Sequence, residues 1–332
     1  MIRYIIRRCL NYVVMLFVAV SMTYFLASIF MDPRSNYEQS PIKPTPGFSI
    51  ENSLNAANIN DKTPIFVRYF RWLTGIVTRW DWGLSPSQAP VGSAVAHRVG
   101  VSLQLVTGAT ILGILIGVSL GVYTAIRQYK WQDRVLNSMS TFLLVVPTAV
   151  MILFIVNIAV LINNSCDDSF GFRLFYVTGL NSYQGDNPFE YIVDLLQHLI
   201  LPTISMTISG MVGYHLTQRT YLLDTMNADY VRTARAKGLP LNIAIRRHAL
   251  RTSLIPTAVD VAFSIAGMFT GAVMTESMYA IHGLGEYFLE TLSQNDINGA
   301  TAVAAFGAVC TLAGALLADI FSAWLDPRIR LS

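Results

Sequence analysis

The side chains best suited to chemistry in this sequence are four ionisable residues inside or beside long apolar runs. They are His215, Asp260, Glu276 and Asp319. An ionisable group is costly in lipid, so such residues usually mark a substrate or proton pathway. Asp260 and Asp319 fall within a turn or two of one end of their runs, which favours helix-end packing. Glu276 falls near the opposite end of its run and is the best candidate for lining a pathway.

Several motifs for catalysis are absent from the sequence. No G-x-x-x-x-G-K-[ST] phosphate loop occurs, so the chain is not expected to hydrolyse ATP by itself. H-E-x-x-H is absent and the 5 histidines are scattered, which argues against a zinc peptidase. A G-x-S-G protease pattern is missing because Thr207 stands where its first glycine would be. Cys9, Cys166 and Cys310 are far apart, so we expect free, packed thiols and no bound metal or cofactor.

Residues 227–256 form a basic, partly polar segment between two apolar runs, each long enough to cross a bilayer. Each of its cations would cost about 2.5–3.5 kcal/mol at the bilayer centre, so the segment must lie on one membrane face. These cations are Arg232, Arg235, Lys237, Arg246, Arg247 and Arg251.

The spacing within this segment predicts two short helices. Asn227 is the expected N-cap of the first helix, and Asp229 falls in its first turn. Cations fill the last turn before Gly238, which suits the C′ position. Pro240 then redirects the chain into a second short helix. A helix–Gly–Pro–helix element on a membrane face is typical of a docking surface for a soluble partner.

Composition places the chain in a membrane. It has 332 residues, of which 53% are hydrophobic and only 13% charged, whereas soluble domains carry about 25% charged residues. Apolar runs near the ~20 residues of a transmembrane helix predict six spans, and because the runs do not alternate the expected fold class is all-α. The spans cover about 10–31, 102–126, 138–162, 194–216, 257–279 and 299–324.

Lysine and arginine predict the orientation of these spans. With the N-terminus in the cytoplasm, the basic N-terminal residues and segment 227–256 fall on the cytoplasmic side, and Arg173 alone falls in a short outer loop. Both termini are then cytoplasmic. The net charge of +3 follows from this asymmetry and does not indicate nucleic acid. The first run exceeds the ~7–15 residues of a signal-peptide core, so we expect it to remain as an anchor.

The sequence of 227–256 resembles the coupling loop of ABC importer permeases, whose pattern is E-A-A-x-x-x-G, nine residues, then I-x-L-P. DYVRTARAKGL followed by RRHALR is closest to the dipeptide and oligopeptide branch. Arg232 and Thr233 stand where Glu-Ala is general, and His248 and Arg251 stand where Ile and Pro are general. These departures are usual in the peptide branch.

Four further stretches match the same branch in order. Gly100, Ser102 and His282 stand where Pro, Thr and Pro are usual, and Ser102 is therefore the expected N-cap of the second span. The resemblance covers nearly the whole chain. The matching stretches are RYFRWLTGIVTRWDWGLSPS, PVGSAVAHRVGVSLQL, ESMYAIHGLGEYFLETLSQNDINGA and LADIFSAWLDPRIRLS.

The resemblance implies a six-helix permease bundle with a cytoplasmic coupling helix and a long extracytoplasmic loop. The implied function is to form half of the translocation pathway of an ATP-driven, binding-protein-dependent peptide importer in the cell membrane. Its implied partners are a second homologous permease, two cytoplasmic ATPase subunits that use ATP and Mg, and an extracytoplasmic binding protein. The implied organisation is an anchor and first span (1–31), an outer loop (32–101), a five-helix core (102–324) with coupling loop 217–256, and a cytoplasmic tail (325–332).

The resemblance also implies that the ATPase subunits contact both halves of the coupling loop. The residues concerned are Asp229, Tyr230, Arg232, Thr233, Ala234, Arg235, Gly238, Arg246, Arg247 and His248. Two alternatives stay open. One is the same machine carrying nickel or oligosaccharides, and the other is a proton-driven secondary transporter with His215, Asp260 and Glu276 as its relay.

Residues 65–80 place apolar and aromatic side chains at helical spacing. We expect Phe66, Tyr69 and Trp80 to bury against the bundle or the bilayer, with Arg68 and Arg71 left available to water. The helix is then either an interfacial or docking helix on the outer side, or a helix packed on the outer ends of the spans. Arg68 and Arg71 are the candidates for holding the binding protein.

Two features of the spans predict how they pack. G-x-x-x-G occurs at 113–117 and again at 117–121, which favours close approach of a second helix. Pro147 interrupts the third span and predicts a kink there.

Overall fold

The computed structural model describes residues 2–38, 49–170 and 173–325. Within these ranges the chain consists of helices and short connections, with one isolated β-bridge between Leu84 and Pro90 and no strand. The all-α prediction is therefore confirmed. The predicted cytoplasmic tail after Leu325 lies outside the described residues.

The chain divides into two compact units. The first contains residues 1–102 and 282–313, and the second contains 103–281 and 314–332. Two long helices, α5 (Val91–Ile126) and α14 (Ile297–Leu325), contribute residues to both units.

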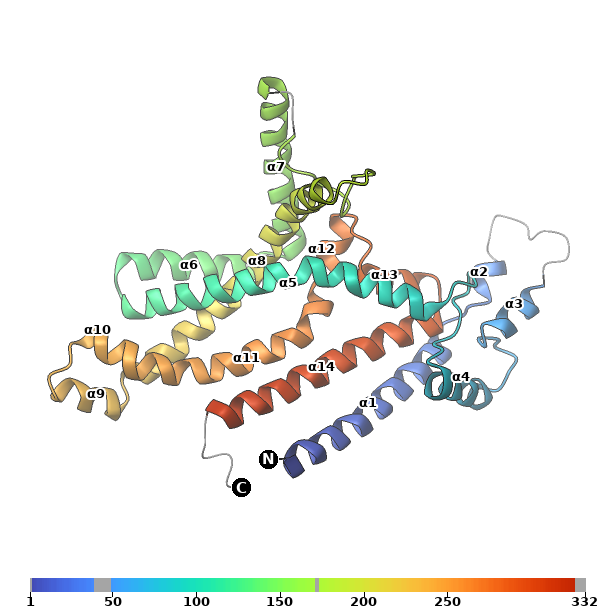
Figure 1. Cartoon of the computed structure of the whole chain (residues 1–332), viewed down its shortest axis with the longest axis horizontal. Helices are drawn as coiled ribbons and strands as arrows, with labels where there is room; N and C mark the ends of the chain where they lie inside the picture. The colour runs from blue at the N-terminus through green and yellow to red at the C-terminus, as the bar shows by residue number, and fades with distance from the viewer. Residues whose placement is uncertain (1, 39–48, 171–172, 326–332) are drawn as a thin grey trace. The chain divides into compact units, whose positions relative to one another are not determined.

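The first unit is held together by an aromatic contact between α1 (Ile2–Phe30) and α4 (Ile65–Arg79). The ring of Tyr24 lies 5.6 Å from the ring of Tyr69 and 4.7 Å from that of Trp72, measured between centroids. All three side chains are buried, and Ser21 exchanges a 2.7 Å hydrogen bond with the Tyr69 hydroxyl. The short helices α2 (Ser35–Glu38) and α3 (Ile50–Ala56) lie between α1 and α4 in the chain (Figure 1).

Only part of the predicted apolar face of α4 packs within the chain. Tyr69 is buried as expected, but Phe66 and Trp80 are 64% and 74% exposed. The reason is that Tyr69 and Trp72 pack against the Tyr24 ring, so the face of α4 that contains Phe66 is left largely exposed. The structure therefore packs α4 on α1 and leaves a second apolar face uncovered by the chain.

The prediction that Ser102 caps the second span is wrong. Helix α5 begins at Val91, so Ser102 lies inside it and is buried. Its hydroxyl accepts a 2.8 Å hydrogen bond from the backbone N–H of Leu284, the first residue of α13 (Leu284–Ser293). A free N–H at a helix start requires an acceptor, and here a different helix supplies it.

The second unit is organised around α8 (Pro188–Met226), which packs against α6 (Trp131–Val145), α7 (Thr148–Phe170) and α11 (Leu250–Gly271). Gly117 and Gly121 of α5 lie directly on α8. A Cβ atom at Gly117 would come within 2.5 Å of the Met211 carbonyl oxygen, and one at Gly121 within 2.8 Å of the His215 carbonyl oxygen. The close helix approach predicted from the G-x-x-x-G pattern is therefore confirmed.

The predicted single helix across 138–162 is wrong. The chain forms α6 (Trp131–Val145) and α7 (Thr148–Phe170), which run in different directions in Figure 1. Val146 between them is extended, with φ −68° and ψ 124°. Pro147 explains this break, because proline disfavours the helical conformation in the residue before it and supplies no N–H.

Among the described residues, five helices are long and apolar enough to cross a membrane. The predicted span 257–279 falls on α11 (Leu250–Gly271) and α12 (Val273–Met278), and part of it, 265–271, lies outside the fully described residues. The five are Ile6–Glu38, Val91–Ile126, Thr148–Cys166, Pro188–Met226 and Ile297–Phe321.

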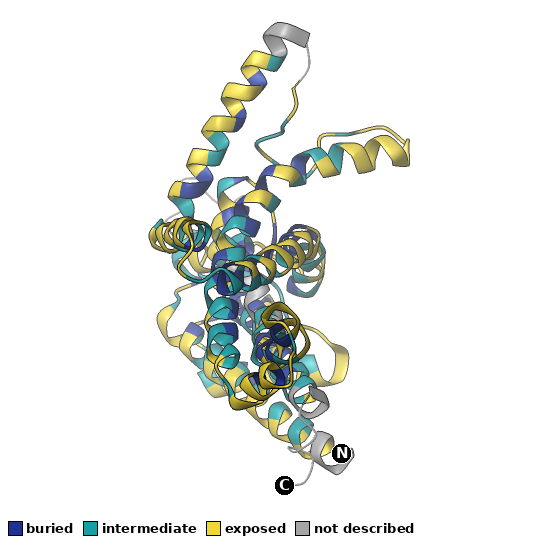
Figure 2. Ribbon diagram, turned by 90° about the vertical axis from the view of Figure 1, so that its left-hand side faces the viewer, coloured by how far each residue is buried: buried dark blue, intermediate teal, exposed yellow. Residues whose placement is uncertain are grey.

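Large apolar side chains lie on the outside of these helices. Helix α7, at the top of Figure 2, is exposed along most of its described length, and Phe154 and Leu161 are each 67% exposed. In water such a surface would be unfavourable, whereas in a bilayer it contacts lipid chains. The burial pattern therefore agrees with a protein embedded in a membrane.

The contact of Gly117 with α8 makes a first prediction. Gly117→Ala should lower the melting temperature of the detergent-solubilised protein, because the added methyl group must displace backbone and overpacking typically costs about 1–3 kcal/mol. Gly108→Ala is the matched control, since a Cβ there meets nothing within 4 Å. It should melt at or above the wild-type temperature. Equal melting temperatures for the two variants would contradict the close α5–α8 contact.

Candidate functional site

The predicted coupling segment is a compact helical hairpin in the second unit. It consists of α9 (Asp229–Ala236), α10 (Leu241–Ala244) and a π-helical turn, η1 (Ile245–Ala249), which continues into α11. Its apolar side chains bury against the ends of α5 and α8. The buried cluster comprises Ala125, Leu222, Val231, Ala234, Ala244, Ile245 and Ala249.

The end of α9 has the geometry predicted from its glycine. Gly238 adopts φ +90°, a conformation in which other residues are strained. The N–H of Gly238 donates to the Arg235 carbonyl at 2.9 Å, and the N–H of Leu239 donates to the Ala234 carbonyl at 3.3 Å. These two bonds form a Schellman motif with glycine at C′, which confirms the expected C-terminus.

The beginning of α9 is not the predicted one. Asn227 ends α8 as its C-cap, and Ala228 is the N-cap of α9 without a side-chain hydrogen bond. Asp229 does fall in the first turn, as expected. Helix α9 therefore begins at Asp229, one residue after the start that an Asn227 cap would give.

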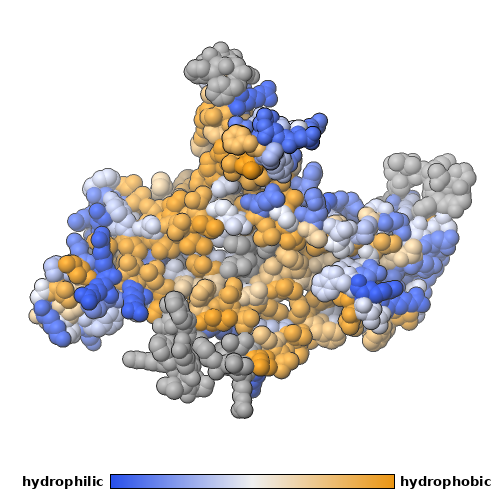
Figure 3. Space-filling model, viewed as in Figure 1, coloured by the Kyte–Doolittle hydropathy of each residue, from blue (hydrophilic) through white to orange (hydrophobic). Residues whose placement is uncertain are grey.

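The hydrophilic side chains of the hairpin face away from its apolar base. Figure 3 shows hydrophilic surface over α9 and α10 next to hydrophobic surface over α6 and α11. Among the predicted coupling residues, Ala234 is buried and His248 is half-buried. The others are exposed: Asp229, Tyr230, Arg232, Thr233, Arg235, Gly238, Arg246 and Arg247.

A shallow hollow of about 550 Å³ opens where α9 turns into α10. Arg232 and Arg235 line one side of it, and Gly238 and Leu241 line the other. The side chains of Arg232 and Asp229 are 71% and 99% exposed and only 3.9 Å apart at their charged atoms. The surface is therefore cationic, accessible and concave, which suits contact with a soluble protein.

Hydrogen bonds connect the hairpin to the long helices. The Thr225 hydroxyl of α8 donates to the Ala249 carbonyl at 3.3 Å, at the end of the π turn. Gln218 of α8 donates to Ser253 at 3.0 Å and accepts a short hydrogen bond from Thr257, both in α11. The π turn η1 is the place where the hairpin joins the bundle. Such turns occur often at functional sites.

Polar contacts also fix α6 against α8. Arg219 of α8 donates to both carboxylate oxygens of Asp133, at 2.8 and 3.0 Å, and this pairing holds the pKa of Asp133 below its usual range. One turn away, the buried ring of His215 contacts the hydroxyls of Ser140 at 2.7 Å and Thr124 at 3.0 Å. Both ring nitrogens of His215 are thus engaged within the helix bundle.

The candidate pathway residues lie in different surroundings. Glu276 is completely buried in α12, inside the second unit. Its neighbour Thr275, rather than Glu276, lines a hollow of about 420 Å³. Asp260 accepts a 3.1 Å hydrogen bond from the Tyr221 hydroxyl, as expected for a residue that packs helix ends.

A polar stripe on α8 was not recognised from the sequence. Two hollows, of about 340 and 420 Å³, lie along it and share Gly210 and Tyr214. The sequence does contain a signal for this stripe, because small or polar residues recur every three or four positions along α8. The prediction of pathway residues considered only the charged side chains. We call this set the α8 stripe: Ser209, Gly210, Gly213, Tyr214, Thr217 and Tyr221.

The expectation that Arg68 is available to water is wrong. Arg68 is only 6% exposed, and its guanidinium donates to the Ile59 carbonyl at 3.4 Å. It occupies the face of α4 that packs inward with Tyr69 and Trp72. Arg71, the second predicted docking residue, is exposed.

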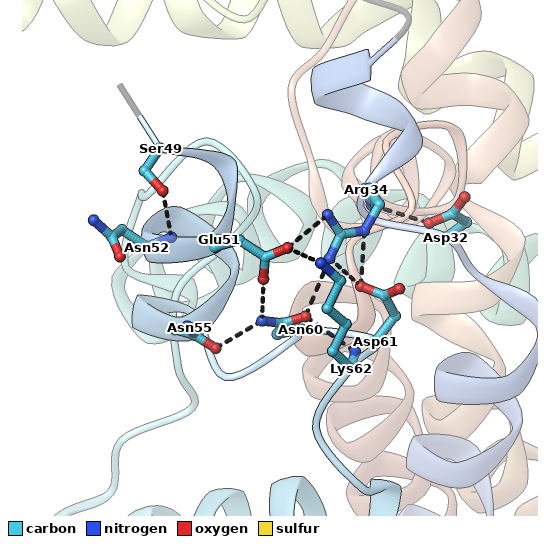
Figure 4. A network of polar contacts seen from close by, with 9 residues as sticks. All are labelled: Asp32, Arg34, Ser49, Glu51, Asn52, Asn55, Asn60, Asp61 and Lys62. Atoms are coloured by element: carbon cyan, nitrogen blue, oxygen red, sulfur yellow. Dashed lines mark hydrogen bonds and ion pairs between the residues drawn. The ribbon is translucent and has the colours of Figure 1, made fainter. Parts of the chain in front are cut away.

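A network of charged residues orders the segment before α4. Arg34 donates to Asp61 at 2.6 and 2.9 Å and to Glu51 at 3.1 Å, while Lys62 also pairs with Glu51 (Figure 4). The bonds from Lys62, Asn60 and Arg34 lower the pKa of Glu51 to about 2. These contacts join the residues that follow α1 to α3 and to the loop that leads into α4.

The comparison with known sequences identifies the family. Residues 113–331 match the family described as "Binding-protein-dependent transport system inner membrane component", and residues 1–109 match its N-terminal region. The chain belongs to this family. The predicted family and the predicted type of protein, a multi-pass membrane permease subunit, are therefore confirmed.

Similar proteins extend over the whole length of this permease. The oligopeptide transport system permease protein OppB of Mycobacterium tuberculosis is 38% identical over 334 residues, covering 100% of both chains. The oligopeptide permease protein AppB of Bacillus subtilis is 30% identical over 282 residues, or 84% of each chain. The dipeptide permease protein DppB of Lactococcus lactis is 28% identical over 334 residues and 100% of both chains.

Proposed function

We propose that this permease forms half of the translocation pathway of an ATP-driven, binding-protein-dependent importer of peptides. The observation that carries the proposal is the cationic helix α9 on its apolar base, in a chain of this family. The full-length similarity to permeases named for oligopeptide and dipeptide transport supports peptides as the cargo. The second half of the pathway is then a homologous permease.

The hairpin is built to transmit force from a soluble ATPase subunit. Val231 and Ala234 of α9 pack on Leu222 of α8 and Ile245 of η1 within one buried cluster. Close-packed contacts of this kind move together rather than deform. A displacement of α9 by an ATPase subunit therefore moves α8 and α11. One ATPase subunit on each permease would use ATP and Mg to drive alternating access.

The exposed coupling residues have separate roles in this proposal. Arg232 and Arg235 border the hollow that receives the ATPase subunit, and Gly238 sets the turn that shapes it. Arg246 and Arg247 extend the cationic surface onto the π turn. The segment must then be cytoplasmic, and the network around Arg34 must be extracytoplasmic.

The α8 stripe is our proposed wall of the pathway. Ser209, Gly210 and Gly213 are exposed although they lie in a helix long and apolar enough to cross the membrane. Polar groups in such helices face a partner helix or a watery path rather than lipid. Hydroxyl groups on the stripe offer hydrogen bonds to a peptide backbone, while the glycines leave room for side chains of different size.

A proton-driven mechanism lacks a comparable arrangement. His215 contacts Ser140 and Thr124, whereas Asp260 contacts Tyr221. These contacts form two separate networks rather than one relay, and the cationic hairpin has no role in that mechanism. Uptake that is insensitive to vanadate would favour the proton-driven alternative.

The first prediction of this proposal concerns Gly238. Gly238→Val should abolish ATP-dependent peptide uptake while the protein still reaches the membrane, because valine is strained at φ +90° and alters the turn beside α9. Gly179→Val is the matched control: Gly179 has φ +81°, and like Gly238 it has open space where a Cβ would lie. Gly179→Val should retain uptake. Loss of uptake in both variants would indicate general misfolding, and normal uptake by Gly238→Val would remove the coupling role.

The second prediction concerns orientation. In a chain whose native cysteines are replaced by serine, Asn52→Cys should react with an impermeant thiol reagent in intact cells. Asn242→Cys should react only after permeabilisation. Both asparagines are exposed, so accessibility within the protein does not explain a difference. The reverse labelling pattern would invert the proposed topology.

The third prediction concerns the α8 stripe. Gly213→Leu should reduce peptide uptake at least about tenfold by narrowing the pathway. Gly108→Leu should leave uptake near the wild-type level, because Gly108 is exposed on α5 and off the stripe. At both positions a Cβ meets nothing within 4 Å, so neither substitution starts with a clash inside this chain. Equal uptake by the two variants would exclude the stripe from the pathway wall.

The fourth prediction concerns docking of the binding protein. We propose that Arg71, the exposed one of the two predicted docking residues, contacts this protein. Arg71→Glu should weaken stimulation of ATPase activity by the loaded binding protein, most strongly at low salt, where exposed charges are least screened. Basal ATPase activity of the assembled complex should stay unchanged. Unaltered stimulation at every salt concentration would exclude Arg71 from the docking surface.

A further inference from the structure

A carboxylate lies beside the α8 stripe, on the neighbouring helix. The smaller of the two hollows along the stripe, about 340 Å³ in volume, opens between α8 and α11 and lies entirely within the second unit. Asp260 of α11 lines this hollow together with Tyr214, Thr217 and Tyr221 of α8. Asp260 is half-buried, so its carboxylate is accessible from the hollow.

One oxygen of this carboxylate is available to a ligand. The Tyr221 hydroxyl donates to Asp260 Oδ2 at 3.1 Å. Among the described residues, no side chain or backbone group bonds to the other oxygen, Oδ1. Asp260 falls within the predicted span 257–279, where an ionisable group usually pairs with an opposite charge or marks a substrate pathway. The described residues supply no such charge, so the partner of this carboxylate comes from elsewhere.

The side chains around Asp260 favour a ligand that donates hydrogen bonds. The described residues that line the hollow carry one negative charge and no positive charge. Tyr214, Thr217 and Tyr221 contribute hydroxyl oxygens that can accept hydrogen bonds, and none of the described lining side chains is a donor only. A primary ammonium group carries a positive charge and three N–H donors. It therefore complements the hollow both in charge and in hydrogen bonding.

A lysine or arginine of the second permease is the rival occupant, and the sequence argues against it. In this chain, 103–126, 199–218 and 252–281 contain no lysine or arginine. A homologous permease with the same pattern brings no cation to the level of Asp260. The hollow is also open beside the glycines that line it, because a Cβ at Gly210 or Gly213 would meet nothing within 4 Å. Open space of this kind suits a ligand that enters and leaves.

We propose that Asp260 binds the N-terminal ammonium group of a peptide as it passes along the α8 stripe. The inference rests on the proposed function, since it takes the stripe as the wall of a peptide pathway. Tyr221 holds one carboxylate oxygen in place, and the other oxygen accepts a charge-assisted hydrogen bond from the ammonium group. This bond replaces water that the ammonium group loses on entering the membrane. Asp260 thereby favours peptides with a free N-terminus.

Uptake by the assembled transporter tests this role. The complex is reconstituted into vesicles with its binding protein and supplied with trialanine or with propionyl-alanyl-alanine, which differs only in lacking the N-terminal amino group. Each compound is used at a concentration that saturates the binding protein, so that a difference in uptake arises in the permease. The wild-type transporter should import trialanine at least about tenfold faster than the analogue. Asp260→Asn should remove this preference by slowing trialanine alone, because asparagine lacks the negative charge.

Two further variants separate this role from other effects of the substitution. Asp260→Glu retains the charge and should still import trialanine faster than the analogue. Asp224→Asn removes an exposed charge one turn after Tyr221, at a position that does not line the hollow, and should import both compounds like wild type.

Three results would overturn the inference while leaving the peptide importer intact. They are equal slowing of both compounds in Asp260→Asn, an unchanged preference for trialanine in that variant, and loss of the second permease from its complex. The last result would show that Asp260 pairs with that subunit. If the wild-type transporter imports neither compound, the proposed function fails and this inference fails with it.

Discussion

Cations are excluded from hydrocarbon, yet in the coupling role that we propose the segment that carries them must move helices that lie inside it. The buried cluster around Leu222 reconciles these two requirements. Val231 and Ala234 give α9 an apolar base of small area, while every cation on α9 and η1 points outward. The hairpin thereby remains at the membrane face and still has direct packing contacts with α8. Most of what we infer about coupling depends on this base.

The same helix, α8, connects the base to the rest of the second unit. Glycines of α5 bring backbone against backbone on one side of it, and Arg219 and His215 hold α6 on another. Polar side chains from α11 contact Gln218 and Tyr221. Because these contacts are short and mostly buried, α8 cannot move without its neighbours. If the α8 stripe lines the pathway, as we propose, such movement would change the surface that contacts the substrate.

Local geometry that only one type of residue readily adopts was predictable from the sequence. Gly238 is an example, because only glycine readily adopts the conformation that ends α9. The G-x-x-x-G pattern is another, since a missing side chain permits close approach whatever the partner. Asp229 in the first turn followed from the helix dipole, even though Asn227 was wrongly assigned as the cap. The family could also be inferred, because its motifs occur in order along the chain.

Features that depend on tertiary contacts were not predictable in this way. Ser102 has the chemistry of an N-cap, but nothing in its neighbourhood indicates that it caps α13 rather than its own helix. Arg68 was expected at the surface because it is charged, whereas the aromatic contact of Tyr24 with Tyr69 and Trp72 turns it inward. Pro147 was recognised as a source of bending, but its effect extends to a complete break between α6 and α7. For Ser102 and Arg68, a contact with a distant residue decides the outcome.

The hydrogen bond between Ser102 and Leu284 joins residues 182 positions apart, and it has a consequence for biogenesis. The first unit consists of the beginning of the chain and a segment near its end. At a synthesis rate of about 5–20 residues per second, roughly 10–40 s separate the emergence of these two parts from the ribosome. During this interval α1, α4 and the start of α5 exist without α13 and α14. The N-terminal part of the first unit must therefore persist with apolar surface uncovered until α13 and α14 have been synthesised.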